Sequence, residues 1–256
     1  MDIITSKQKI NNLLELKNIY NNHNIKKKEG VYSWHNLNSK KKFGQGFIFF
    51  ETFSPKYGNH KSIKKTNISL EQPHFFWDYL KKFYGKVQNF VFFHLNNLTL
   101  NKYSNENYYY SNFSNKKTIY FKVMRSKSFM EKQIIVPIKF WSKFCKFLEK
   151  NTKKIYCYLA ICKFSYGRKR FLRYSGKGIS IALNFSVNKA SLDFSKKLDK
   201  FCEERQIIIN IYKDSYVKKK TIKLIFGKEY YKFCNMLNKY DKERIFRSHM
   251  SKKFEI

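Results

Sequence analysis

The order of apolar patterns between residues 131 and 213 limits the fold of this chain more than any other feature. Strand-like alternation and helical spacing follow one another there in the order β-α-β-β-α-β, which is the order of a ferredoxin-like split unit. We therefore predict an α+β fold, an antiparallel sheet with helices on one face and this unit over 131–213. Its parts are strand 133–136 closed by Pro137, helix 139–151, strands 155–164 and 178–187, a helix capped by Asn188, and strand 207–212.

The flanking sequence has weaker patterns. Apolar residues at helical spacing predict a helix within 7–28, ending in the cationic turn Lys26–Lys28 and Gly30. The remaining predicted elements are strands 31–34 and 46–53, an exposed connection 55–73, a short helix 75–87, a strand 91–95, a loop 101–117 and a final helix 230–240.

The charge of the chain suggests a nucleic-acid binder, and the way the charge is made argues against that reading. The 53 Lys and Arg against 18 Asp and Glu give a net charge of +35. Almost all of the cations are lysines, although arginine is the residue that recognises phosphate and guanine bidentately. A joint excess of Lys, Asn, Ile, Tyr and Phe is typical of an A+T-rich genome, so composition is a weak indicator of function.

Other global signals point to an intracellular protein. Five cysteines without a close pair do not form a disulfide framework, which favours a reducing compartment. The first residues lack the apolar segment of a secretory signal, and no apolar run is long enough to cross a bilayer. We expect a cytoplasmic location, and the lysines leave peripheral contact with the inner membrane open.

No zinc, acyl-transfer or nucleotide-phosphate motif is present in the sequence. Two lysines at strand ends, Lys163 and Lys213, are candidate donors to an anionic ligand. Taken singly, Lys163 is better explained as a lysine that reaches water, and Lys213 as part of a turn. Asp214 either orients Lys213 or begins a turn.

Five motifs in order resemble the decaprenylphosphoryl-β-D-ribose 2-oxidase family, which are flavin-linked enzymes of the vanillyl-alcohol-oxidase type. The resemblance covers residues 31–254. The motifs are Val31–Trp34 with Phe43–Gly46, Lys132–Pro137, Ala160–Phe164 with Gly167, Gly178–Phe185, and Ile211–Ser215 with the tail Phe246–Phe254.

The resemblance implies a role for each matched residue. Lys213, with Tyr212, would lie at the flavin and stabilise the negative charge that arrives with the hydride. Lys163 and Gln133 would line the sugar-phosphate pocket, joined by Glu131 and by Ser180 of the glycine-led strand. The family reaction oxidises the ribose 2-hydroxyl of a polyprenyl-phosphate sugar to a ketone, and FAD receives the hydride.

The departures from the family pattern are substantial. Tyr216 replaces an arginine, Glu131 replaces a glutamine and would repel phosphate, and His249 replaces an aspartate. The family's flavin-binding domain has no counterpart here. We accordingly expect an N-terminal helical lead-in at 1–30, a substrate-binding cap at 31–206, and a C-terminal segment at 207–256 that packs on a separate FAD-binding domain.

Three functions follow from these observations. The first is the cap half of an FAD-dependent sugar oxidoreductase, with a separately encoded FAD domain as partner, or a degraded remnant of it. A short-chain dehydrogenase acting on the keto product and a lipid-linked sugar phosphate would be its other partners. The second is a basic RNA- or ribosome-associated protein, which aromatic residues among lysines, such as Tyr108–Tyr110, favour. The third is a structural remnant without a ligand.

Overall fold

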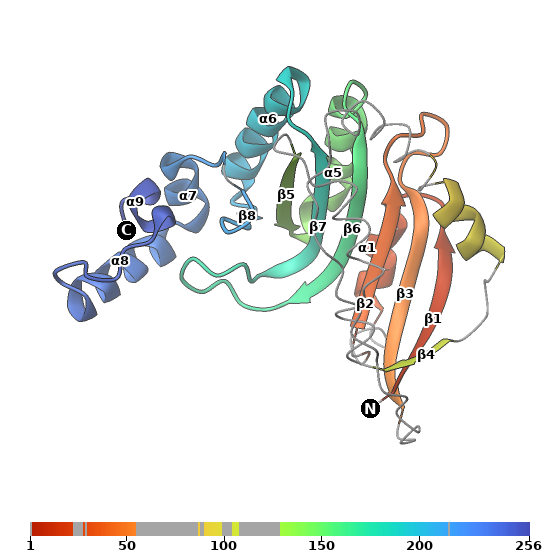
Figure 1. Cartoon of the computed structure of the whole chain (residues 1–256), viewed down its shortest axis with the longest axis horizontal. Coiled ribbons are helices and arrows are strands. Elements are labelled where there is room, and N and C mark those ends of the chain that lie inside the picture. Colours follow the sequence, from red (N-terminus) through yellow and green to blue (C-terminus); the bar gives the residue numbers. More distant parts are fainter. Residues whose placement is uncertain are drawn as a thin grey trace, which may run out of the picture. The chain divides into compact units, whose positions relative to one another are not determined.

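The computed structural model describes residues 2–22, 28, 30–54, 87, 90–98, 104–107, 129–214 and 216–256. The chain forms two compact units, one of Met1–Phe129 with Tyr156–Ile161 and one of Met130–Ile155 with Cys162–Ile256. Figure 1 labels their elements. Both units contain strands and helices. The predicted α+β class is confirmed.

The first unit is an antiparallel sheet in which β3 is central. Its elements are β1 (Asp2–Ile10), α1 (Glu15–Asn21), β2 (Gly30–Asn36), β3 (Gln45–Ser54) and β4 (Ser104–Asn107). β3 pairs with β1 along the whole length of β1 and with β2 on its other side, and β4 pairs with β1. The strands predicted at 31–34 and 46–53 are confirmed.

The helix predicted within 7–28 is wrong at both ends. Residues 2–10 form β1, where pairing with β3 gives the backbone polar groups hydrogen-bond partners that outweigh the helical spacing of a few side chains. Among the described residues of this range only those of α1 are helical, and α1 ends at Asn21. Gly30, predicted as the helix stop, is the first residue of β2.

Aromatic side chains form the core of the first unit. Trp34 and Phe47 are buried, and residues 90–98 pack a helix against them. Ring centroids lie 4.8 Å apart for Trp34 and Phe92, and 5.3 Å apart for Phe47 and Phe93. The strand predicted in this segment is therefore wrong, because a short apolar run fits a half-buried helix as well as a strand.

The second unit follows the predicted β-α-β-β-α-β order. Its elements are β5 (Phe129–Val136), α5 (Ile138–Asn151), β6 (Cys157–Tyr166), β7 (Lys177–Ser186), α6 (Lys189–Arg205) and β8 (Ile208–Ile209). The strand order β6-β7-β5-β8 is that of a ferredoxin-like sheet. β8 is shorter than predicted, because the chain turns after Asn210, whose carbonyl accepts from Lys213 N–H at 3.2 Å.

Helices α5 and α6 cover one face of this sheet. Phe147 of α5 and Phe201 of α6 lie 4.7 Å apart between ring centroids, and Phe194 of α6 meets Phe185 of β7 at 5.5 Å. Each fully buried aromatic or aliphatic side chain here stabilises the fold by about 1.5–3 kcal/mol. Asn188 caps α6 as predicted, through a reciprocal pair of bonds with Ser191.

Gly178 explains how closely β7 approaches β5. Its φ is +153°, and a Cβ at this position would collide with the carbonyl oxygen of Val136. A side chain would therefore push the two strands apart, which makes glycine the residue that fits the start of β7.

Three helices complete the second unit: α7 (Lys219–Phe226), α8 (Lys228–Tyr240) and α9 (His249–Phe254). The predicted final helix corresponds to α8, whereas α7 and α9 were not predicted. The end of the chain is packed, because Phe254 is buried and its carbonyl accepts from the Tyr230 hydroxyl at 3.3 Å.

Several predictions concern segments outside the described residues. These are the connection 55–73, nearly all of the helix 75–87, Tyr108–Tyr110 and most of the loop 101–117, in which residues 104–107 form β4. None of the helices that the structure describes is both long and apolar enough to span a bilayer.

Candidate functional site

Strand β5 carries two of the predicted site residues, Glu131 and Gln133, on one of its two faces. Successive side chains of a strand point to opposite faces. Lys132 and Ile134 therefore lie on the side that α5 and α6 cover. Glu131, Gln133 and Ile135 lie on the other side, which these helices leave uncovered and which we call the open face, although Ile135 itself is buried.

Lys213 and Glu131, both predicted as site residues, form an ion pair on the open face. The Lys213 Nζ lies 2.8 Å from Glu131 Oε1, although the residues are 82 positions apart. Half of the Lys213 side chain is exposed, whereas that of Glu131 is 16% exposed. The ammonium is thus anchored at one carboxylate, on a side chain that is half exposed.

Gln133, which follows Glu131 by two residues on β5, is held by hydrogen bonds from Asn210. The Asn210 backbone N–H donates to the Gln133 carbonyl at 2.8 Å, and its side-chain amide donates to Gln133 Oε1 at 2.7 Å. The Asn210 Oδ1 in turn accepts from the N–H of Tyr212 at 3.2 Å. Asn210 was not predicted, although its place three residues before Lys213 was a usable signal.

Ser180 is buried on β7 and its hydroxyl lies 2.7 Å from the hydroxyl of Tyr174. Burial raises the pKa of Tyr174, and the negative charge of Glu131 contributes in the same direction. Tyr174 therefore stays a neutral hydroxyl that can donate or accept a hydrogen bond close to Glu131. Sequence reasoning missed Tyr174, because it lies in an irregular loop before β7.

Lys163 and Tyr212 are placed less centrally. Lys163 is exposed on β6, and β7 lies between β6 and β5, so it stands about 10 Å from the Gln133 strand. Tyr212 is 68% exposed in the turn before Lys213. Of the predicted residues, the structure joins Lys213 to Glu131 directly and sets Gln133 beside them.

The helix-covered side of β5 holds a second charged group that sequence reasoning missed. The Lys132 ammonium is fully buried, lies 3.0 Å from Asp199 Oδ1 and also pairs with Asp214. Asp214 Oδ1 accepts from the N–H groups of Tyr216 and Val217 at 3.0 and 3.1 Å. Asp214 therefore begins the turn, one of the two predicted alternatives.

Burial dominates the electrostatics of this group. Desolvation raises the pKa of Asp199, and Lys132 opposes that shift. Burial also raises the pKa of the neighbouring Cys202 thiol well above its ordinary value. The described part of the chain contains no cluster of three His, Cys, Asp or Glu side chains suited to a metal ion.

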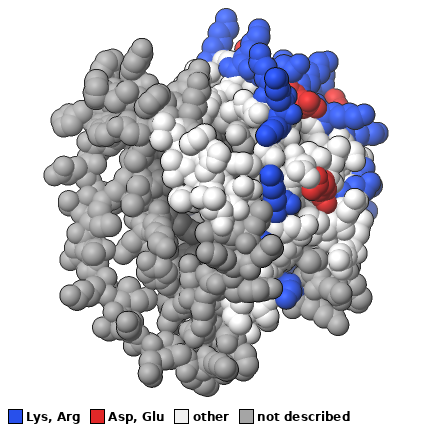
Figure 2. All heavy atoms as spheres, turned by 90° about the vertical axis from the view of Figure 1, so that its right-hand side faces the viewer, with Lys and Arg blue, Asp and Glu red and all other residues white. Residues whose placement is uncertain are grey.

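On the one face that Figure 2 shows, the charge of the described residues is not spread evenly. On the face shown in Figure 2, Lys and Arg gather along the upper edge with a few carboxylates among them, and much of the remaining described surface there is uncharged.

Comparison with known proteins found similar chains among solved structures. No protein-family model and no curated protein matches the chain. Similar solved structures include berberine bridge enzyme from Eschscholzia californica, at 11% identity and a TM-score of 0.39, covering 79% of this chain and 41% of that chain. BBE-like 28 from Arabidopsis thaliana matches at 12% identity and a TM-score of 0.35, over 79% and 40%. The match thus covers less than half of the length of either protein.

Proposed function

We propose that the second unit is the substrate-binding part of an FAD-linked oxidoreductase that converts the 2-hydroxyl of a lipid-phosphate-linked ribose to a ketone. The observation that carries the proposal is the Lys213–Glu131 pair beside Gln133 on the open face. Lys213 and Gln133 come from two of the five motifs that resemble the oxidase family, and Glu131 directly precedes one of them. They lie far apart in sequence and adjacent in the fold.

The described residues fit part of an FAD molecule. The exposed Lys213 ammonium and the Tyr212 ring suit the edge of the flavin ring, where a cation and an aromatic surface are useful. Among the described elements, no glycine-rich turn leads from a strand into a helix, as a pyrophosphate site at a helix N-terminus would require. We propose that a separately encoded domain binds the rest of the cofactor.

Each residue of the site then has a defined task. Bound FAD would supply the hydride acceptor for the sugar carbon. The Lys213 ammonium is fixed in place by Glu131 and provides positive charge at the developing anion. Because the ammonium is already in position, it does not have to reorganise during the reaction. In this proposal the Glu131 carboxylate accepts the proton of the sugar hydroxyl, and Gln133 orients the sugar by hydrogen bonding.

The C-terminal region supports the need for a second protein domain. The C-terminal segment exposes five large apolar side chains. They are Tyr231, Met236, Tyr240, Ile245 and Phe246, from 42% exposed at Met236 to 86% at Phe246. Met236 and Tyr240 are four residues apart on the same side of α8, and neighbouring exposed apolar side chains of this kind suit a protein partner. The proposed partner is the FAD-binding domain.

The test is to purify the tagged chain from the cells that make it and record the visible absorption of the complex. We expect a co-purifying protein, the absorption band of flavin, and loss of both with Ile245→Asp/Phe246→Asp. Lys242→Asp, a charge change at another exposed position of the same segment, serves as the control. A colourless preparation would contradict the proposal.

Binding to RNA is the second candidate, because the same segment is strongly basic. Residues 228–253 contain eight Lys and Arg against three Asp and Glu, alongside the exposed rings of Tyr231 and Tyr240. Aromatic stacking and phosphate contacts of this kind bind single-stranded RNA. A salt titration decides: affinity that persists near physiological ionic strength supports this candidate, and its absence removes it.

Further partners remain proposals that depend on the first function. A short-chain dehydrogenase would reduce the keto product, and the lipid-linked substrate would bring the complex to the inner membrane as a peripheral protein of the cytoplasm.

A further inference from the structure

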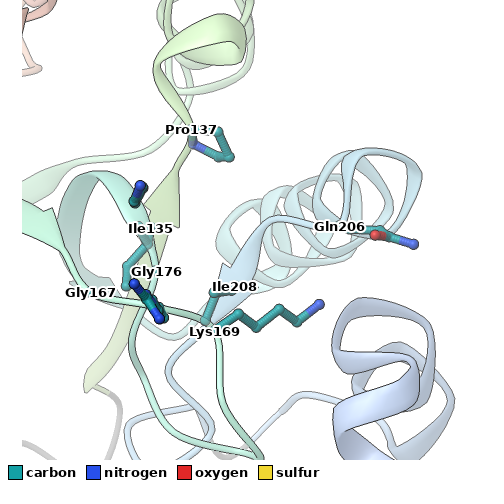
Figure 3. A pocket seen from close by; sticks show the side chains of 9 residues that line it. Ile135, Pro137, Gly167, Lys169, Gly176, Gln206 and Ile208 are labelled. Atoms are coloured by element: carbon teal, nitrogen blue, oxygen red, sulfur yellow. The ribbon is translucent and has the colours of Figure 1, made fainter.

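A cavity of about 320 Å³ lies in the second unit, between the end of β5, β8 and the loop that connects β6 to β7. Ile135 and Ile208, which are paired across β5 and β8, contribute apolar wall, and Pro137 extends it. Figure 3 shows Ile135, Gly167, Gly176 and Ile208 gathered together, with the extended Lys169 side chain beside Ile208. The volume is sufficient for a small organic ligand.

The polar lining of the cavity is cationic. Arg168, Lys169 and Lys177 come from the connecting loop and the first residue of β7, and Gln206 adds an amide at the end of α6. None of the residues that line this cavity is acidic. Three cations beside an apolar wall are complementary to an anion attached to an apolar group.

Lys169 is the cation that benefits most from an anionic ligand. Its Nζ donates to the backbone carbonyl of Ile225, and burial lowers its pKa, with the charge of Glu229 opposing the shift. Glu229 is engaged elsewhere, since it accepts from the Phe171 N–H at 2.8 Å and pairs with Lys232. An anion in the cavity would supply the counter-charge.

The cavity is distinct from the Lys213–Glu131 pair. Ile135 lies on the open face of β5, four residues beyond Glu131, which corresponds to about 13 Å along a strand. A ligand confined to the cavity therefore does not contact Lys213.

We propose that this cavity binds an organic anion with an apolar body, in which a carboxylate or phosphate meets the three cations and a hydrocarbon group covers Ile135 and Ile208. The proposal goes beyond the proposed oxidation, because the binding needs neither flavin nor turnover.

The test is isothermal titration of the full chain with octyl phosphate, octanoate, octanol and inorganic phosphate. We expect the two octyl anions to bind at least about tenfold more tightly than octanol or inorganic phosphate, since only they satisfy both the cations and the apolar wall. Whichever octyl anion binds more tightly identifies the head group, and either order supports the proposal. Equal binding of octanol, or of inorganic phosphate, would overturn it.

Two variants locate the site. Arg168→Gln/Lys177→Gln should weaken octyl anion binding at least about tenfold. The matched control Lys146→Gln/Lys197→Gln removes two exposed lysines from α5 and α6 and should change it less than about twofold. Equal effects of the two double variants would show that only net charge matters, and the proposal would fail.

A steric variant tests the apolar wall without altering charge. A Cβ at Gly176 would lie 2.7 Å from Ile208 Cδ1, so Gly176→Ala pushes against the wall of the cavity. We expect it to weaken octyl anions at least about threefold relative to inorganic phosphate, with circular dichroism confirming the fold. An unchanged ratio in a folded variant would contradict the assignment.

Discussion

The two sides of β5 carry lysine–carboxylate pairs of opposite character. Glu131 and Lys132 are neighbours on this strand, and Lys213 and Asp214 are neighbours in the turn after β8. On the open face Lys213, whose side chain is half exposed, pairs with Glu131. On the helix-covered side Lys132 meets Asp214 with both side chains almost fully buried.

The difference shows that burial, and not the type of residue, separates a structural charge from one that a ligand can use. The buried Lys132 has two carboxylate partners and is isolated from water. A buried ammonium of this kind must keep its partners, because an unpaired charge there is very costly. Lys213 keeps its charge in contact with solvent, so its pair adds little to stability and stays accessible.

The largest effect should come from Lys132→Ala. This variant leaves the buried Asp214 and the partly buried Asp199 without their cation, and we expect a loss of about 3–5 kcal/mol in the free energy of unfolding. Urea denaturation followed by circular dichroism measures it. A loss below about 1 kcal/mol would show that the buried pair is not structural.

The same role of burial can be tested in the first unit through His35. Its ring is buried between Gly44 O, 2.8 Å away, and Ser33 Oγ, 2.7 Å away, and burial lowers its pKa from 6.5 to about 4. The unfolded chain therefore takes up the proton first as pH falls. Stability should be intact above pH 6.5 and decrease by about 3 kcal/mol as the pH falls towards 4.

The variant His35→Gln isolates this contribution. The difference in unfolding free energy between the original chain and the variant should shrink as the pH is lowered from 7 to 4.5. A constant difference over that range would contradict a buried neutral ring.

The triple replacement Lys132→Met/Asp199→Asn/Asp214→Asn sharpens the comparison. It removes the buried charges together, and the amide oxygen introduced at position 214 would still accept from the turn N–H groups that the Asp214 carboxylate serves. We expect it to be at least about 2 kcal/mol more stable than Lys132→Ala in the same urea measurement. Equal instability would mean that the loss comes from packing and not from unpaired charge.

The smallest stability effect belongs to the open face. Lys213→Ala should cost at most about 1 kcal/mol, because exposed ion pairs contribute little. Thermal unfolding at low and high salt would check this. A loss as large as that of Lys132→Ala would remove the distinction between the two sides.

The sequence predicted most of the second unit and less of the first. Local signals were sufficient where they agree with the fold, as at Pro137 after β5, Asn188 before α6 and the alternating residues of β7. They failed for 2–10 and 90–98, where pairing with β3 and packing on Trp34 decide the structure. Such long-range contacts leave no periodic trace in the segment itself.

The candidate site was predicted in part for the same reason. Lys213 and Gln133 could be identified from their motifs, whereas their hydrogen-bond partners could not. The pairing of Asn210 with Gln133 and of Tyr174 with Ser180 depends on how β5, β7 and β8 lie together, and the Lys132–Asp214 pair depends on which face of β5 the helices cover.

The measurement that tests the central claim most directly is flavin reduction in the complex purified from the source cells. A polyprenyl-phosphate ribose added without oxygen should bleach the flavin band, and the complex carrying Lys213→Met should react about 100-fold more slowly. Lys146→Met, a change at an exposed residue of α5, should leave the rate unchanged. Equal rates for Lys213→Met and the original chain would contradict the role of the open face.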